Sequence, residues 1–130
     1  MPLNDDDFMR YSRHLLMSDI GESGQQKLSQ ARVLIVGMGG LGCPVSLYLA
    51  AAGIGRIGII DDDRVDITNL QRQVIHATAA VGSLKVESAA IRIKQLNPEV
   101  EVVKHDIRLN VENALELLAG YDVIIDGTDN

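Results

Sequence analysis

The sequence predicts an α/β fold with a doubly wound, mainly parallel sheet, and two observations lead to this prediction. Short apolar runs, too brief for lone helices, alternate with segments of helical periodicity. A glycine-rich turn at residues 37–42 joins the apolar run 33–36 to a helix expected over residues 41–52. Another apolar run, 57–60, follows and completes a strand–helix–strand unit. Such a unit is typical of Rossmann-like domains.

The glycine turn has the residue types that a phosphate-binding turn needs. Gly37, Gly39 and Gly42 lack side chains, so the main chain can approach a phosphate closely, and the next helix offers unpaired N–H groups. Pro44 is tolerated in the first turn of that helix, where a missing N–H costs nothing. Asp61 follows about 19 residues after Gly42, near the spacing at which an acid meets a nucleotide ribose. A tight turn that binds nothing is the alternative, but this context favours a nucleotide site.

Composition limits the classes of function. The 130 residues are 46% apolar with one Phe and no Trp, so aliphatic side chains must build the core. A net charge of −6 argues against a nucleic-acid partner. There is no apolar run of about 18 residues, and the N-terminus is acidic where a signal peptide would be basic. We therefore expect a cytoplasmic protein without a membrane partner. The single cysteine, Cys43, allows neither an internal disulfide nor a zinc cluster within these residues.

Residues 1–31 are expected to form a helical segment that precedes the nucleotide-binding domain of residues 32–130. A helix is predicted over residues 4–17, with Asn4 as its N-cap and acids in its first turn. Its apolar face would consist of Phe8, Tyr11 and Leu15. Its basic residues, for which a solvated surface is the first interpretation, are Arg10, Arg13 and His14. A short amphipathic stretch, 25–28, then leads into the first strand.

The polar segment after the second strand, residues 64–85, is expected to border the site. It leaves the carboxyl end of that strand, beside the glycine turn, where ligands bind in open α/β sheets. A loop of this length in a compact domain is usually functional or disordered. Its candidate site residues are Asn69, Arg72, Gln73 and Lys85. A solvated loop with scattered charge is the alternative.

The remaining predicted elements are helices over 86–97 and 111–119 and strands starting at 101–103 and 123–125. Asn110 should cap the second helix, with Leu115 and Leu118 pointing inward. In a doubly wound sheet the fourth strand lies next to the first, so residues 126–130 should face the glycine turn. Asp129 should then point toward the nucleotide phosphates. A sheet that stops there leaves an edge uncovered, which predicts the N-terminal part of a longer protein.

The candidate residues suit a reaction on ATP. Arg72 and Lys85 can neutralise charge on phosphoryl oxygens, and Asp129 can hold Mg²⁺ through its oxygens. No Ser, Cys or His looks like an activated nucleophile, and adenylation by an incoming carboxylate needs none. Two alternatives stay open: an NAD-binding oxidoreductase domain, which needs only the glycines and Asp61 from this half of the fold, and a non-catalytic fragment that keeps the fold.

Four ordered motifs together resemble the ubiquitin-activating-enzyme superfamily, specifically its bacterial ThiF- and MoeB-type adenylyltransferases. They are GMGGLG at 37–42, DDDRVDITNLQRQ at 61–73, Lys85 within VGSLKVESA, and DGTDN at 126–130. The opening FMRYSRHLL matches the helix that precedes this domain in the family. The resemblance spans nearly the whole chain, and DFMRYSR with the DDD run favours ThiF over MoeB.

The resemblance implies an activity. The family activates the C-terminal Gly-Gly of a small ubiquitin-like sulfur carrier: its carboxylate attacks the α-phosphate of ATP, releasing pyrophosphate and forming an acyl-adenylate. The implied carrier is ThiS-like, for thiamin biosynthesis, with a MoaD-like carrier of molybdopterin biosynthesis as the alternative. A zinc site and a sulfur-transfer cysteine would lie beyond Asn130.

The resemblance also implies roles for matched residues. Gly40 would lie at the phosphates, Asp61 would bind the ribose, and Asp129 would hold Mg²⁺. The phosphate chain would be contacted by Asn69, Arg72 and Lys85. Arg13 would reach the triphosphate of the other subunit in a homodimer. Further implied nucleotide-binding positions, with less definite roles, are Gly37, Gly39, Gly42, Asp63, Thr68, Leu70, Gln71, Gln73 and Asn130.

Overall fold

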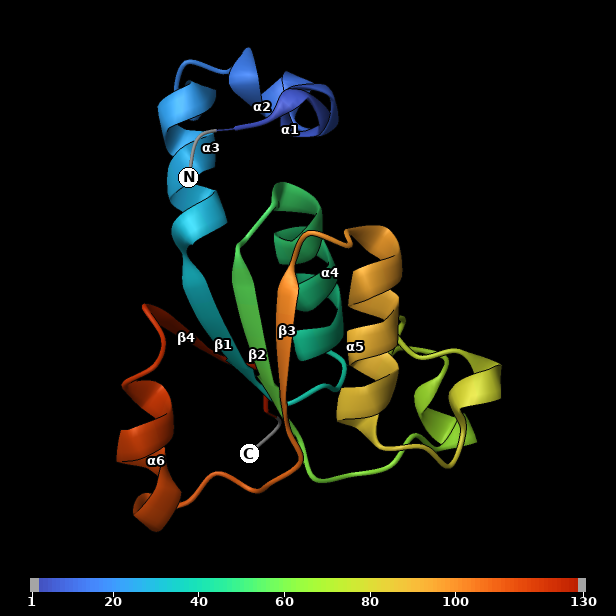
Figure 1. The fold of residues 1–130 in the computed structure, drawn as a ribbon. Coiled ribbons are helices and arrows are strands. Elements are labelled where there is room, and N and C mark those ends of the chain that lie inside the picture. Colours follow the sequence, from blue (N-terminus) through green and yellow to red (C-terminus); the bar gives the residue numbers. More distant parts are fainter. Residues whose placement is uncertain (1–2, 129–130) are drawn as a thin grey trace.

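A four-stranded parallel sheet forms the centre of the computed structural model, which describes residues 3–128 (Figure 1). The strands are β1 (Arg32–Val36), β2 (Arg56–Ile60), β3 (Glu101–His105) and β4 (Val123–Asp126). Their order is β3-β2-β1-β4, and every neighbouring pair is parallel. The predicted Rossmann-like α/β class is therefore confirmed, and the fourth strand lies beside the first.

Helices cover both faces of the sheet. On one face, α4 (Gly42–Ala52) and α5 (Lys85–Leu96) pack on alternate strand residues such as Ile35 and Ile59, which are fully buried and paired in register. Each such isoleucine contributes about 1.5–3 kcal/mol by leaving water. On the other face lies α6 (Val111–Leu118) (Figure 1). Because all four strands are parallel, their carboxyl ends lie at one edge of the sheet.

The segment before the sheet contains α1 (Asp5–Arg10), α2 (Ser12–Leu15) and α3 (Gly21–Gln30). Asn4 caps the first helix with a complete capping box, as predicted. The prediction of one helix over residues 4–17 was wrong, because the helix is interrupted at Tyr11 (φ −104°, ψ 19°). The break turns the Tyr11 side chain into the protein, where its hydroxyl accepts a hydrogen bond from Asn97 (2.8 Å). Phe8 does not share this burial and is 41% exposed.

The third helix is longer than the stretch 25–28 expected from the sequence. It begins at Gly21 because tertiary contacts outweigh the low helix propensity of its two glycines. Gln25 is fully buried; its amide donates to the Ala52 carbonyl (2.8 Å) and its oxygen lies 2.9 Å from Nδ1 of His14. These bonds attach the segment to the end of α4.

The later elements agree with the predictions except in detail. Asn110 caps α6 with a capping box, as predicted. Leu118 is half-buried on the sheet side, but Leu115 is 83% exposed, so its predicted inward direction was wrong: within residues 3–128 nothing packs over that side of the helix. Residues 64–84 also contain two unpredicted 3₁₀ turns, η1 (Ile67–Asn69) and η2 (Thr78–Ala80). No helix within residues 3–128 is long and apolar enough to span a membrane.

Candidate functional site

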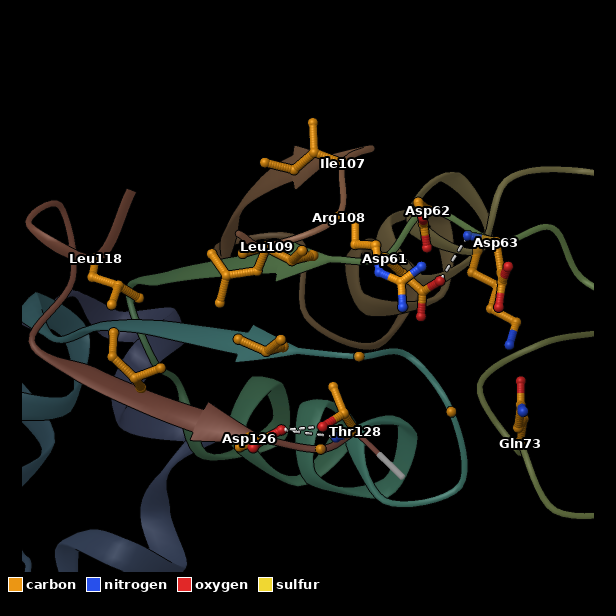
Figure 2. Close-up of a pocket in the computed structure, with 17 residues that line it drawn as sticks. Asp61, Asp62, Asp63, Gln73, Ile107, Arg108, Leu109, Leu118, Asp126 and Thr128 are labelled. Carbon is orange, nitrogen blue, oxygen red and sulfur yellow. Dashed lines mark hydrogen bonds between the residues drawn. The ribbon is translucent and has the colours of Figure 1, made fainter. Parts of the chain in front are cut away.

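A pocket of about 680 Å³ lies at the carboxyl ends of the strands (Figure 2). Its walls come from four places: the glycine turn after β1, the acids after β2, the connection from β3 to α6, and the end of β4. Gln73 and Lys85 close it on the side of the 64–84 loop. The pocket therefore lies where parallel α/β sheets bind ligands.

The first half of the glycine turn is anchored to β2. The N–H of Gly37 donates to the Ile60 carbonyl (2.8 Å), and the N–H of Met38 donates to Oδ2 of Asp61 (2.8 Å). Gly37 has a φ of 95°, which favours glycine, and a Cβ there would contact the main chain of Gly127 at 3.2 Å. The turn thus packs directly against the end of β4.

The second half of the turn is open. No group within residues 3–128 accepts a hydrogen bond from the N–H of Gly39 or of Gly40. A Cβ on Gly39 would have no neighbour nearer than 3.7 Å (Gln73), and one on Gly40 none nearer than 3.8 Å (Arg72). By contrast, a Cβ on Gly42 would overlap the main-chain oxygen of Gly37. Two glycines therefore offer free donors, and the third permits close packing.

Three consecutive acids line the pocket after β2. Asp61 accepts a second main-chain bond, from the N–H of Asp63 to Oδ1 (2.8 Å), so it braces both the glycine turn and its own loop. Each acid from Asp61 to Asp63 offers an oxygen within 4.8 Å of the others. Carboxylate oxygens are the ligands that Mg²⁺ prefers. The predicted metal ligand, Asp129, and its neighbour Asn130 lie outside the described residues.

The 64–84 loop and the start of α5 bring three predicted residues to the turn. Lys85 is 7% exposed, lines the pocket, and donates its N–H to the Asp63 carbonyl (2.9 Å). Gln73 is 4% exposed and also lines the pocket, and its Oε1 has no partner among the described atoms. Arg72 is exposed beside Gly40, with its guanidinium on the Thr68 carbonyl (3.2 Å). A cation, an amide and a guanidinium therefore converge on the open half of the turn.

Four predicted residues in and directly after η1 do not line the pocket; they are Thr68, Asn69, Leu70 and Gln71. Two of them shape the loop instead. Oδ1 of Asp66 accepts from the N–H and the hydroxyl of Thr68, and the Asn69 side chain accepts from the N–H of Asp66 (2.9 Å). The bonds from Thr68 lower the pKa of Asp66. The nucleotide contacts predicted for these four residues stay predictions.

Arg13 is far from this pocket within one chain. It lies on α2, at the amino ends of the strands, whereas the pocket lies at their carboxyl ends (Figure 1). Its side chain is exposed. A role for Arg13 at a phosphate therefore requires a second subunit, as the resemblance implies.

Part of the pocket was not predicted. Figure 2 shows Ile107, Leu109 and Leu118 on the side of the pocket away from Asp63, with Arg108 close to Asp61. Ile124 also lines the pocket. The signal was available for residues 107–109, because the segment after β3 must emerge at the same edge as the acids after β2. For Ile124 no signal existed, since its exposure depends on how far α6 covers the sheet.

The single cysteine is a packed core residue, as predicted. Cys43 is fully buried, its Sγ–H donates to the Met38 carbonyl (3.3 Å), and burial raises its thiol pKa to about 11.

The histidines form no metal cluster among the described residues. His105 lies 3.0 Å from the Tyr121 hydroxyl, and burial lowers its pKa.

The fold and the site define a Rossmann-like α/β domain with a glycine turn of the kind that binds nucleotides. The family model described as the ThiF family matches residues 11–130. The chain belongs to the ThiF family, which confirms the resemblance stated from the motifs.

Relatives and solved structures agree with this membership. The chain is 55% identical over 128 residues to "Adenylyltransferase and sulfurtransferase MOCS3" of Anopheles gambiae, covering 98% of this chain and 29% of that protein. It is 54% identical over 128 residues to "Probable adenylyltransferase/sulfurtransferase MoeZ" of Mycobacterium tuberculosis (strain CDC 1551 / Oshkosh), covering 98% of this chain and 33% of that protein. The chain thus spans about a third or less of these relatives. The E. coli tRNA N6-threonylcarbamoyladenosine dehydratase TcdA, solved in complex with ATP, superposes with a TM-score of 0.91 at 34% identity, covering all of this chain and 53% of that one.

Proposed function

We propose that this chain forms the nucleotide-binding part of an enzyme that adenylylates the C-terminal glycine carboxylate of a ubiquitin-like sulfur carrier. The observation that carries the proposal is the convergence, in one pocket, of the open glycine turn, Asp61 and the buried Lys85. The adenylyltransferase names of the relatives and the ATP complex of TcdA support it. Because the chain spans only part of these relatives, the activity of the whole protein belongs to the proposal.

The reaction makes one bond and breaks one. A carboxylate oxygen of the carrier attacks the α-phosphorus of ATP, the bond from that phosphorus to the bridging oxygen breaks, and pyrophosphate leaves with the electron pair. The free N–H groups of Gly39 and Gly40 would hold phosphate oxygens, while Lys85 and Arg72 neutralise the charge that develops there. No protein nucleophile is required.

The nucleoside end of ATP would lie along the second half of the pocket. Asp61 retains lone pairs to accept a ribose hydroxyl while it holds the turn. Beyond it, Ile107 and Leu109 offer an apolar surface of the kind that a base can contact. In this proposal the triphosphate lies at the turn and the base lies toward α6.

Magnesium fits the donor set of the site. Asp129, predicted from the DGTDN motif, would hold the ion, and the exposed carboxylates of Asp62 and Asp63 are near enough to each other to assist. When bound, the ion would neutralise phosphate charge. We also propose a homodimer, because Arg13 lies at the opposite end of the sheet from the pocket of its own chain and could reach a phosphate only in the pocket of another copy. A cytoplasmic location is proposed separately, from the acidic N-terminus and the composition of the chain.

The carrier follows from the same activity. We propose a ThiS-like carrier of thiamin biosynthesis, from the likeness of the N-terminal helix and the DDD run to ThiF. A MoaD-like carrier of molybdopterin biosynthesis is the alternative, and the names of the MOCS3 and MoeZ relatives fit it as well.

Carrier-dependent ATP–pyrophosphate exchange tests the proposal. The full-length protein should exchange labelled pyrophosphate into ATP only when a carrier ending in Gly-Gly is present, and the faster of ThiS-like and MoaD-like carriers identifies the partner. Arg72→Ala and Asp129→Ala should each lower the exchange rate at least tenfold, whereas Arg92→Ala, an exposed change on α5 away from the pocket, should not. Exchange without a carrier, or tighter binding of NADH than of ATP with Mg²⁺, would refute the proposal.

A further inference from the structure

His76 lies buried between the glycine turn and α5, outside the set of residues already assigned to the site. It is 6% exposed and comes from the 64–84 loop, three residues after Gln73. Its Nε2 is 3.1 Å from the Met38 carbonyl oxygen, and its Nδ1 is 2.7 Å from Oγ of Ser88. The imidazole therefore bridges the turn and the helix that begins with Lys85.

The direction of these two hydrogen bonds follows from the groups involved. A carbonyl oxygen only accepts, so Nε2 of His76 must carry the proton and donate to Met38. In the neutral ring Nδ1 is then the acceptor, and the Ser88 hydroxyl donates to it. The resulting chain of bonds, Ser88 to His76 to Met38, has one direction.

This chain fixes the peptide unit between Met38 and Gly39. The unit is planar and trans, so its carbonyl and its N–H point in opposite directions. His76 and, more weakly, the Sγ–H of Cys43 hold the carbonyl toward the protein interior. Gly39 lines the pocket and its N–H has no acceptor within residues 3–128, so this N–H must point toward the pocket.

We propose that His76 is a positioning residue that aims the Gly39 N–H at a phosphate oxygen of the nucleotide, with Ser88 selecting the tautomer that donates to Met38. The inference rests on the proposed nucleotide function and deepens it. His76 itself touches neither the nucleotide nor the carrier. It acts by orienting a donor for the most highly charged part of the ligand.

Binding of ATP and of adenosine by the full-length protein tests this role, measured by calorimetry at pH 7.5. His76→Leu removes the donor to the Met38 carbonyl and should raise the Kd for ATP about tenfold, because the misaligned Gly39 N–H then loses its hydrogen bond to a charged phosphate oxygen. The Kd for adenosine should stay unchanged, because adenosine has no phosphate. His76→Gln restores an N–H donor near the Nε2 position and should recover most of the ATP affinity.

Ser88→Ala provides the second variant if His76→Leu does not fold. It removes the hydroxyl that selects the tautomer, and it should raise the Kd for ATP several-fold without changing that for adenosine. Equal loss of both ligands, or wild-type ATP affinity in His76→Leu or in a folded Ser88→Ala protein, would overturn the positioning role. A wild-type protein that binds no ATP would instead refute the proposed function itself.

Discussion

Substituting Gly39 with alanine separates the ligand-binding role of the glycine turn from its role in folding. Gly39 does not have a positive φ, and the nearest atom to an added Cβ would be 3.7 Å away, an ordinary contact distance. The folded chain therefore accepts the methyl group. Because alanine also restricts the unfolded chain, the expected change in stability is between zero and a gain of about 1 kcal/mol.

The same methyl group should weaken ATP binding strongly. It would occupy the open side of the turn, where a phosphate has to approach the free N–H of Gly39. Loss of one hydrogen bond to a charged group costs about 1.5–3 kcal/mol, which is roughly a 10- to 100-fold increase in Kd. Calorimetric titration with ATP and thermal unfolding without ligand measure the two effects separately.

Gly42→Ala is the matched control with the opposite pattern. Its Cβ would overlap the Gly37 oxygen, so the turn and α4 would have to separate, at a cost of about 1–3 kcal/mol or more. This variant should lose stability before any ligand is added. If Gly39→Ala bound ATP as tightly as the wild type, the glycine turn would not be the phosphate site.

Three further predictions concern the interior. The thiol of Cys43, whose pKa burial raises to about 11, should not react with a thiol reagent at pH 8 in the native protein and should react fully in denaturant; native reactivity would contradict its burial. Burial lowers the pKa of His76 below its value of about 6.5 in the unfolded chain, so the free energy of unfolding is highest above pH 6.5 and falls at lower pH, where the unfolded chain binds a proton that the folded chain does not. Urea unfolding at pH 7.5 and 5.5 should show a larger decrease in the free energy of unfolding for the wild type than for His76→Gln. Gly58→Ala would overlap the Tyr121 ring and should cost about 1–3 kcal/mol, less in a Tyr121→Ala background; an equal cost in both would place the strain elsewhere.

The sheet could be predicted because its signals are local. The apolar runs, the glycine turn and the Asn110 cap depend on neighbouring residues, and each element formed within a residue or two of its predicted bounds. The errors arose where distant contacts decide. Tyr11 breaks its helix to meet Asn97, which is 86 residues away, and Gln25 extends α3 through a bond to Ala52.

The site was predicted in outline because sheet topology brings strand ends together. The glycine turn, Asp61 and Lys85 do line one pocket, but the roles assigned to individual residues stay predictions. The sequence could not show which candidate side chains were already engaged in hydrogen bonds within the chain. Thr68 and Asn69 illustrate this, since their side chains build the loop within the chain itself.

Asp61 has a structural role in addition to its predicted contact with the ribose. Its carboxylate accepts N–H bonds from Met38 and Asp63, and His76 donates to the carbonyl of the same Met38. The two main-chain polar groups of Met38 are thus fixed by one residue after β2 and one in the 64–84 loop. A change at Asp61 should therefore disturb the orientation of the Gly39 donor as well as the ribose contact. Loss of ATP binding in an Asp61 variant would combine both effects, and adenosine binding would report the ribose contact alone.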